Sequence, residues 1–221
     1  MEYNIIESGS SGNAILVNKI ILLDCGVAYS KIKSIIKNVK VIFISHLWLH
    51  SDHCKDSTIK KIAFEHPRIK FITCKENAKH LLSLGVAKQN VFALDFDKWF
   101  DIGICKVRLE QLFHDVENAA LKIDFNGFKC IYIVDTNECY QIDAKDYDYA
   151  WVEANYSTDE ELQEKIREAE ENGEFTYLKR VLHTHLSQLD ALNWLQKNNI
   201  TNYRFIHEHK TKEGKEANNV Y

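Results

Sequence analysis

The order of strand-like and helix-like segments constrains the fold of this chain most strongly. Three short strands are predicted first, at 3–7, 14–17 and 20–24, and turn-rich sequence separates them. Helices and strands then alternate, as apolar residues recur first at helical and then at strand spacing. The predicted segments of this part are helix 29–37, strand 40–45, helix 56–65, strand 70–74 and helix 76–84.

A second strand-rich stretch begins at Cys105. The Asn126-Gly127 pair is a strong hairpin signal between predicted strands 119–125 and 128–134. The remaining predicted segments are strand 148–153, helix 158–172, helix 187–198 and strand 203–207. Two strand-rich halves with helices outside them fit a layered α/β sandwich better than a singly wound parallel sheet.

Length and composition predict one soluble domain. The 221 residues are 45% hydrophobic and 27% charged, and they contain neither an internal repeat nor a linker. We therefore expect a single domain over 1–221. No apolar run approaches the ~20 residues needed to cross a bilayer. The N-terminus enters strand-like sequence without the features of a secretory signal, so we expect a cytoplasmic protein that contacts no membrane.

The cysteines and the net charge narrow the chemistry. The six cysteines include no Cys-x-x-Cys pair, and several lie in apolar runs, which indicates buried, reduced thiols. The formal net charge of -4 provides no global basic field. Avid nonspecific binding to duplex nucleic acid is therefore not indicated, and a small or locally bound substrate is easier to accommodate.

The segment from His46 to His53 carries the strongest chemical signal. Three histidines and one aspartate lie within it, directly after a predicted apolar strand. Imidazole and carboxylate groups are the ligands that zinc, manganese and iron accept in hydrolytic sites. Because further histidines and aspartates recur at later predicted strand ends, we predict a shared metal centre rather than a solvated loop with incidental histidines.

This segment resembles the His-x-His-x-Asp-His signature of metallo-β-lactamase-fold hydrolases. The turn Ser8-Gly-Ser-Ser-Gly-Asn13 resembles the opening of a bacterial and phage branch of that superfamily. Further pieces in matching order extend the resemblance over nearly the whole chain. They are Ile21-Leu-Leu-Asp24-Cys-Gly26, Phe113-His114-Asp115, Ile133-Val-Asp135-Thr136, Val152-Glu-Ala-Asn-Tyr-Ser157, Arg180-Val-Leu-His-Thr-His185-Leu-Ser187 and Phe205-Ile-His207. The resemblance implies a four-layered αβ/βα sandwich of the metallo-β-lactamase type.

The resemblance also implies two metal ions and their ligands. His46, His50 and His114 would bind one ion, Asp52, His53 and His207 would bind the other, and Asp135 would bridge them. We expect divalent ions, zinc first and manganese as the alternative. Two such ions about 3.5–4 Å apart hold a bridging hydroxide, polarise a phosphoryl oxygen and stabilise the leaving oxygen. Asp24 is expected to orient a ligand histidine.

Two positions depart from the family pattern. Three residues separate His46 from His50, where the family has one. Either the loop bulges and His46 keeps its ligand position, or Trp48 takes that position and one metal site is weakened. We favour the bulge, because His46 follows the predicted strand as the family's first histidine does. Near the C-terminus, His209 competes with His207, and we favour His207 because it directly follows a predicted strand.

The same resemblance suggests the reaction. The fold alone does not fix a substrate, because lactams, thioesters, lactones and phosphodiesters are all cleaved on it. His185 lies in a stretch that resembles a motif of transfer-RNA 3′-processing nucleases, where it would donate a proton to the leaving oxygen or hold the phosphate. With Asp52 as a second catalytic residue and a full second metal site, phosphodiester cleavage is the predicted reaction.

Similarity to phage and bacterial enzymes that degrade antiviral cyclic mononucleotides makes such a nucleotide the first expected substrate. Trp48 and Asn155 are predicted to contact it. A single-strand exonuclease or RNase-like enzyme of the same fold is one alternative. A non-catalytic nucleotide-binding sponge with a degraded metal site is the other, motivated by the altered spacing of the first two histidines. The resemblance further suggests a homodimer.

Overall fold

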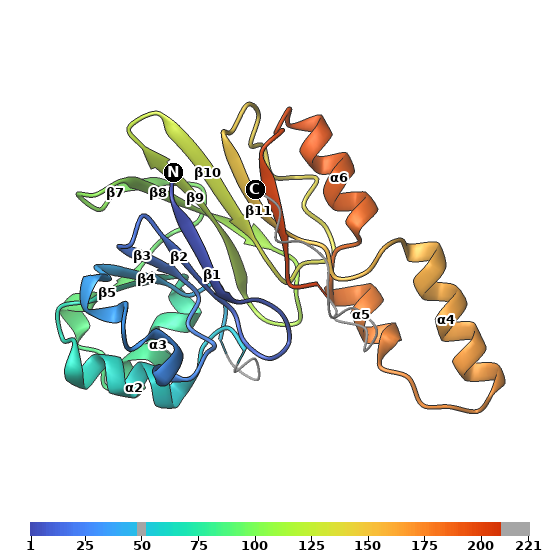
Figure 1. The fold of residues 1–221 in the computed structure, drawn as a ribbon, viewed down its shortest axis with the longest axis horizontal. Helices are drawn as coiled ribbons and strands as arrows, with labels where there is room; N and C mark the ends of the chain where they lie inside the picture. The colour runs from blue at the N-terminus through green and yellow to red at the C-terminus, as the bar shows by residue number, and fades with distance from the viewer. Residues whose placement is uncertain (48–51, 209–221) are drawn as a thin grey trace.

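The computed structural model describes residues 1–47 and 52–208 (Figure 1). Within these residues, two six-stranded sheets pack face to face. The first sheet has the order β1-β2-β3-β4-β5-β6, antiparallel over its first three strands and parallel from β3 to β6. Its strands are β1 (Tyr3–Glu7), β2 (Ala14–Val17), β3 (Ile21–Leu23), β4 (Val41–Phe43), β5 (Lys70–Thr73) and β6 (Val91–Ala93).

The second sheet has the order β12-β11-β10-β9-β8-β7. Strands β10, β11 and β12 run parallel, and β7 to β10 form an antiparallel meander. Its strands are β7 (Trp99–Asp101), β8 (Lys106–Leu112), β9 (Asn118–Phe125), β10 (Phe128–Ile133), β11 (Tyr149–Glu153) and β12 (Tyr203–Ile206). Both sheets therefore contain parallel strands whose carboxyl ends can build a site together.

Helices cover the outer faces of both sheets. In Figure 1, α2 and α3 lie below the first sheet, α6 lies beside β11, and α4 and α5 project as an arm. The elements are α1 (Tyr29–Ile32), η1 (Ile36–Asn38), α2 (Asp56–Glu65), α3 (Lys75–Ser83), η2 (Lys88–Asn90), α4 (Asp159–Glu171), α5 (Leu178–Thr184) and α6 (Gln188–Lys197). Thr158 caps α4 and Ser187 caps α6, each accepting a backbone N–H three residues on.

Three hydrophobic clusters hold these layers together. The first lies between the sheets and includes Phe43 and Tyr132. The second joins the first sheet to its helices, with Phe71 and Ile59 among its buried residues, and the third joins the second sheet to α6 through Trp194. Full burial of such side chains stabilises the fold by about 1.5–3 kcal/mol each. The predicted four-layered α/β sandwich is therefore confirmed.

Most predicted elements are confirmed to within one or two residues, but the segment 29–37 is not one helix. It forms the single turn α1 and the 3-10 turn η1. Both Ile32 and Ile36 are buried, as the helical spacing predicted. The chain nevertheless has to turn early, because the Lys40 N–H bonds to the Ile20 carbonyl, 2.8 Å away, to start the β3–β4 pairing.

Four elements of the described residues were not predicted: the strands β6 and β7, the helix α5 and the 3-10 turn η2. The two strands and the 3-10 turn are only three residues long, and the apolar residues of α5 are only partly buried. In α5 only Thr184 is buried, and β6 and β7 contain no fully buried residue. The expectation of reduced, buried cysteines is confirmed, since all six are free and buried. Among the described residues, none of the helices combines the length and apolar character that a bilayer crossing requires.

Candidate metal centre

The candidate site forms where the carboxyl ends of strands from both sheets meet. His46 follows β4, and Asp135 and His207 follow β10 and β12. Asp24, Asp135 and His207 all have left-handed backbone conformations, with φ of 56°, 50° and 55°. Such a conformation costs a non-glycine residue about 1–2 kcal/mol. Strain at three converging strand ends is typical of a functional site whose side chains are held in place by the surrounding structure.

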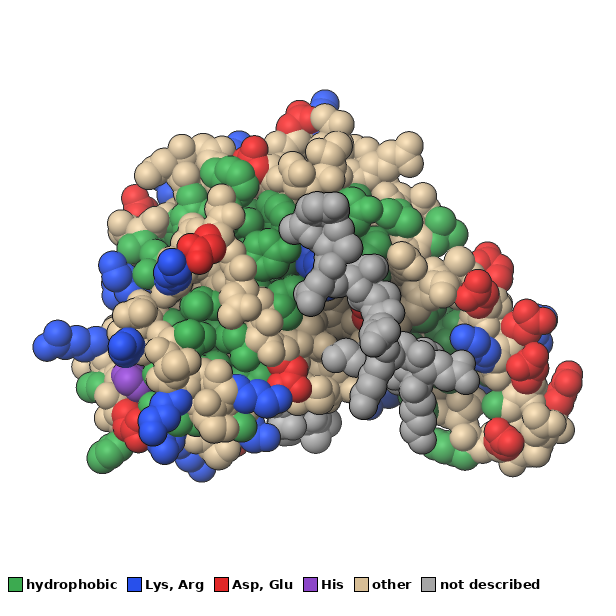
Figure 2. All heavy atoms as spheres, viewed as in Figure 1, with side chains coloured by type: hydrophobic (Ala, Val, Ile, Leu, Met, Phe, Trp, Pro, Cys, Tyr) green, Lys and Arg blue, Asp and Glu red, His purple; other side chains and the backbone are tan. Residues whose placement is uncertain are grey.

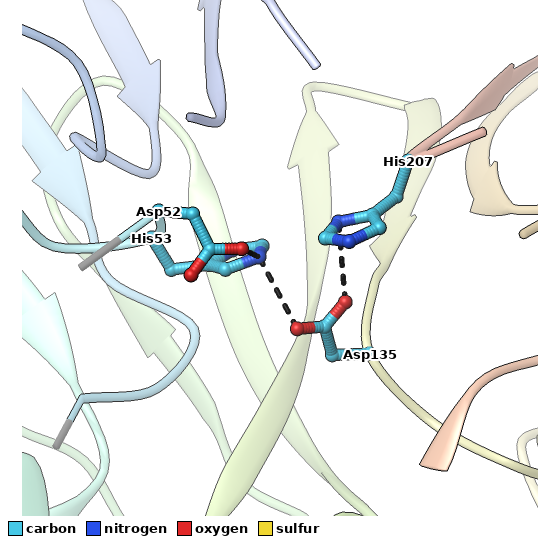
Figure 3. A group of neighbouring side chains, drawn as sticks. All are labelled: Asp52, His53, Asp135 and His207. Atoms are coloured by element: carbon cyan, nitrogen blue, oxygen red, sulfur yellow. Dashed lines mark ion pairs between the residues drawn. The ribbon is translucent and has the colours of Figure 1, made fainter. Parts of the chain in front are cut away.

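Asp135 is the centre of this cluster. Its Oδ2 lies 3.3 Å from His46 Nε2 and 3.3 Å from His53 Nε2. Its Oδ1 lies 3.2 Å from His207 Nδ1. Figure 3 shows the carboxylate between the His53 and His207 rings, with Asp52 beside them. Two further imidazoles are close, those of His114 at 3.8 Å and His185 at 3.6 Å.

Three groups of side chains place potential ligand atoms within 4.8 Å of one another, and Asp135 belongs to all three. The groups are Asp52, His53, Asp135 and His207; His46, His114 and Asp135; and Asp135, Glu153, His185 and His207. The first two match the two predicted ligand sets except for His50. The structure thus brings together residues from 46 to 207 in the chain.

Several predicted residues lie outside the described part of the chain. They are Trp48, His50 and His209. His46, which competed with Trp48 for the first ligand position, is buried within 3.3 Å of Asp135. His207, which competed with His209, is likewise within the cluster at 3.2 Å.

The buried polar atoms fit a divalent cation. Within the described residues, Asp135 Oδ1 and His207 Nδ1 are both buried, and although they lie 3.2 Å apart, neither makes a hydrogen bond. A buried polar atom without a partner costs about 1–3 kcal/mol, so such atoms normally mark an ion, a water or a functional strain. Imidazole nitrogens mixed with carboxylate oxygens are a donor set that zinc accepts readily. The residues present therefore fit a metal ion.

Asp24 fixes the orientation of His53, as predicted for it. The buried Asp24 carboxylate accepts the His53 Nδ1–H at 2.6 Å and the Tyr132 hydroxyl at 2.7 Å. It also accepts the Ser45 N–H at 2.8 Å and the Ser45 hydroxyl at 2.9 Å. Because Asp24 binds the Nδ1 of His53, the Nε2 of that ring faces Asp135. Asn13, from the Ser8–Asn13 turn, has its Nδ2 2.9 Å from the same His53 Nε2.

Burial and mutual proximity shift the protonation of this cluster. Burial alone would raise the pKa of Asp135, but the nearby His207 and His53 outweigh it and hold that pKa well below its usual value. Burial opposes the charged form of His53 too, yet Asp135 and Asp24 raise its pKa well above normal. Burial and the neighbouring His53 lower the pKa of His46. An ionised carboxylate among imidazoles is the charge pattern that suits a cation.

A histidine–glutamate pair borders the cluster. His185 Nδ1 lies 2.5 Å from Glu153 Oε1, and the other Glu153 oxygen accepts the Thr136 N–H at 3.0 Å. Burial opposes the charged imidazole, but the Glu153 carboxylate raises the pKa of His185 to about 9. No role was predicted for Glu153, although an acid that ends an apolar strand was a visible signal.

Two other predicted residues lie beside the centre. Asp52 Oδ2 is 3.5 Å from His53 Nε2, and its side chain is partly exposed. Asn155, predicted to contact substrate, donates its Nδ2–H to the His207 backbone carbonyl at 3.0 Å. That bond ties the loop after β11 to the loop after β12. The Asn155 side chain is thus within one hydrogen bond of the candidate metal centre.

Comparisons with known proteins agree with this architecture. The chain matches no protein-family model and no curated protein. Among solved structures, the metallo-β-lactamase fold protein YhfI from Bacillus subtilis aligns with a TM-score of 0.72 and 14% identity, over 95% of this chain and 86% of that one. The short form of human tRNase Z gives a TM-score of 0.70 and 14% identity, over 95% and 93%. A diphosphatase of the PhnP family gives 0.63 and 12%, over 94% and 85%.

These alignments cover almost all of the chain, and they place it in one structural class. The chain has the metallo-β-lactamase fold. At 12–14% identity the likeness defines the fold, and the chemistry has to be inferred from the site.

Proposed function

We propose that this protein is a dinuclear metal-dependent phosphodiesterase that cleaves a nucleotide phosphodiester. The single observation that carries the proposal is the position of Asp135, whose carboxylate is shared by all three groups of potential metal ligands. One carboxylate that serves two adjacent groups is what a bridging ligand requires, because each of its oxygens can face a different ion.

The proposed ligands follow from the two groups. His46 and His114 would hold one ion, together with the predicted ligand His50. Asp52, His53 and His207, whose side chains Figure 3 draws around Asp135, would hold the other. When bound, a pair of zinc or manganese ions supplies Lewis acidity and activates water for hydrolysis.

His185 is proposed to handle the proton of the leaving group. Glu153 binds its Nδ1, which leaves Nε2 as the nitrogen that can face a substrate. A histidine oriented in this way by a buried carboxylate can transfer a proton to a leaving oxygen. The same histidine also belongs to the third ligand-capable group, so its role is tested separately below.

Charge supports a mononucleotide rather than a long nucleic acid as the substrate. Acidic side chains gather along the projecting α4, at the right of Figure 2. A nucleic-acid strand that crossed this arm would meet these negative charges, and the net charge of -4 supplies no compensating field. The similar tRNase Z and PhnP-family diphosphatase support phosphate-ester chemistry in general. We therefore propose a cyclic mononucleotide first.

The test is a substrate panel with metal reconstitution. Protein stripped with a chelator and reloaded with zinc or manganese is assayed against cyclic mononucleotides, bis(p-nitrophenyl) phosphate, single-stranded RNA and single-stranded DNA. We expect turnover of cyclic mononucleotides and of bis(p-nitrophenyl) phosphate only with metal. Turnover of the polymers alone would favour the exonuclease alternative, and stoichiometric nucleotide binding without product would favour the sponge.

A matched pair of histidine variants controls for folding. His53→Ala removes a buried member of the cluster, whereas His80→Ala removes a partly exposed histidine that pairs with Asp56 on the first sheet's helices. We expect the first to abolish turnover and the second to retain it. Equal activity in both variants would contradict the proposed site.

A further inference from the structure

A pocket of about 570 Å³ lies between the projecting helical arm and the second sheet, next to the metal centre. Its walls come from the loop after β11, from α4 and α5, and from the first turn of α6. Its lining includes Asn155, Tyr156, Lys165, Tyr177 and Gln188. Nothing in the ligand assignment above uses this pocket.

Three contacts connect the pocket to the metal centre. Asn155 binds the His207 carbonyl at 3.0 Å, and the Tyr156 hydroxyl lies 3.4 Å from the His185 carbonyl. Glu208, the residue after His207, is also part of the lining. A molecule whose phosphate lies at the metal centre can therefore extend into this pocket.

The pocket offers aromatic and apolar faces. Its apolar lining includes Leu162, Leu178 and Val181. The Tyr156 ring is held in place, because its hydroxyl bonds to Asp159 at 2.8 Å and its carbonyl accepts the Gln188 N–H at 2.7 Å. A ring fixed before a ligand arrives binds a planar group with little loss of conformational entropy.

Polar groups lie at the edge of the same pocket. Within residues 1–47 and 52–208, no ion pair or side-chain hydrogen bond engages the Lys165 ammonium or the side-chain amide of Gln188. Lys165 lies one helical turn from Leu162 on α4, so both face the pocket. An ammonium donor and an amide that both donates and accepts match the polar edge of a nucleobase.

We propose that this pocket binds the nucleobase of a mononucleotide whose phosphodiester lies at the metal centre. This inference rests on the proposed phosphodiesterase function and adds where the substrate's base is held. Aromatic rings, apolar walls and a few edge groups are the features by which proteins hold single bases. The volume of about 570 Å³ accommodates a nucleoside and falls within the range of small-molecule sites.

The test uses two substrates that share a leaving group. Thymidine 5′-(p-nitrophenyl) phosphate carries a nucleoside, and bis(p-nitrophenyl) phosphate does not. The variants are Tyr177→Ala, which removes a ring that is 54% exposed, and Ser157→Trp, which adds a bulky side chain at an exposed position of the pocket lining. Phe64→Ala is the matched control, because Phe64 is 86% exposed on α2 and lies outside the pocket.

We expect both pocket variants to lower kcat/KM for the nucleoside ester at least fivefold more than for bis(p-nitrophenyl) phosphate, mainly through KM. The control should change both substrates by less than about twofold. Equal losses on the two substrates, or no loss on the nucleoside ester, would overturn the inference.

Calorimetric binding of AMP, GMP, CMP and UMP provides a readout that does not need turnover. We expect Tyr177→Ala and Ser157→Trp to weaken binding of at least one of these nucleotides about fivefold or more. If the two variants bind nucleotide more weakly but the wild type hydrolyses no phosphodiester, the nucleobase pocket is supported and the proposed phosphodiesterase function is rejected. If the wild type hydrolyses bis(p-nitrophenyl) phosphate but both variants keep the wild-type nucleotide affinity, the nucleobase pocket is rejected and the phosphodiesterase function is supported.

Discussion

Replacement of Gly26 by alanine is expected to disrupt the proposed metal centre without removing any of its proposed ligands. A Cβ at this position would lie 1.6 Å from the Asp52 carbonyl oxygen and 2.0 Å from its carbonyl carbon. An ordinary contact begins at 3.4 Å, so the two segments would have to separate by about 1.8 Å. The Asp52 carbonyl also accepts the Asn13 backbone N–H at 2.6 Å, and this hydrogen bond opposes the separation.

The displaced backbone carries two predicted ligands, Asp52 and His53. A misplacement of about 1 Å in a catalytic site costs on the order of 100-fold in rate, or about 2.7 kcal/mol. Overpacking of the core adds about 1–3 kcal/mol of lost stability. We therefore expect Gly26→Ala to lower kcat/KM for bis(p-nitrophenyl) phosphate about 100-fold or more and to weaken zinc binding.

Gly103→Ala is the matched control for this experiment. Gly103 has φ of +85°, and a Cβ there meets nothing within 4 Å. The control should lose about 1–2 kcal/mol of stability from backbone strain alone and keep its metal affinity. Thermal unfolding measures the stability, zinc calorimetry measures the metal affinity, and the hydrolysis assay measures kcat/KM. Wild-type zinc affinity and stability in Gly26→Ala would refute the reasoning.

Three further substitutions probe other parts of the site and fold. Asp24→Asn is expected to weaken zinc affinity about 10–100-fold in a chelator competition, since it disturbs the group that orients His53, and an unchanged affinity would count against that role. His185→Gln should lower kcat for phosphodiesters by about 10²–10⁴ with the metal content unchanged, whereas loss of an ion would make His185 a ligand. Trp194→Ala should cost about 3–5 kcal/mol in chemical denaturation, because Trp194 is fully buried, and a loss below about 1 kcal/mol would contradict the packing described.

The sequence predicted the residues that lie in recognisable local patterns. His46, Asp52 and His53 stand close together directly after an apolar strand, and Asp135 and His207 follow other strands. Hydrophobic spacing and turn residues also marked the principal strands and helices of both sheets. Local spacing was sufficient for these strands and helices and for the His46–His53 segment, because each signal lies within a few consecutive residues. The ligand roles expected of Asp135 and His207 came from the resemblance to metallo-β-lactamase-fold hydrolases.

Apart from Asp24, the groups that hold the site in place could not be predicted from the sequence. Tyr132 and Asp24 are 108 residues apart, and their hydrogen bond exists only because the two sheets pack face to face. Ser45 and Glu153 are single polar residues at strand ends, and neither type at such a position indicates a partner by itself. Their roles depend on tertiary packing, which no spacing within the sequence records.

The arm formed by α4 and α5 illustrates the same limit. The charged helix α4 was predicted, but α5 was not, because its apolar residues Leu178, Val181 and Leu182 span little more than one turn and are only partly buried. The pocket between this arm and the second sheet follows only from the arrangement of both helices. A subsite built from several weakly patterned segments is therefore accessible only from the structure.

The central claim is that Asp135 joins two cation sites, and metal stoichiometry tests it most directly. Zinc titration of chelator-treated protein, with the bound metal measured by mass spectrometry, should give about two ions per chain in the wild type. The Asp135→Ala variant should bind neither ion tightly, because the Asp135 carboxylate belongs to every group of potential ligands in the described structure. Retention of two tightly bound ions by Asp135→Ala, or no tight binding by the wild type, would contradict the account.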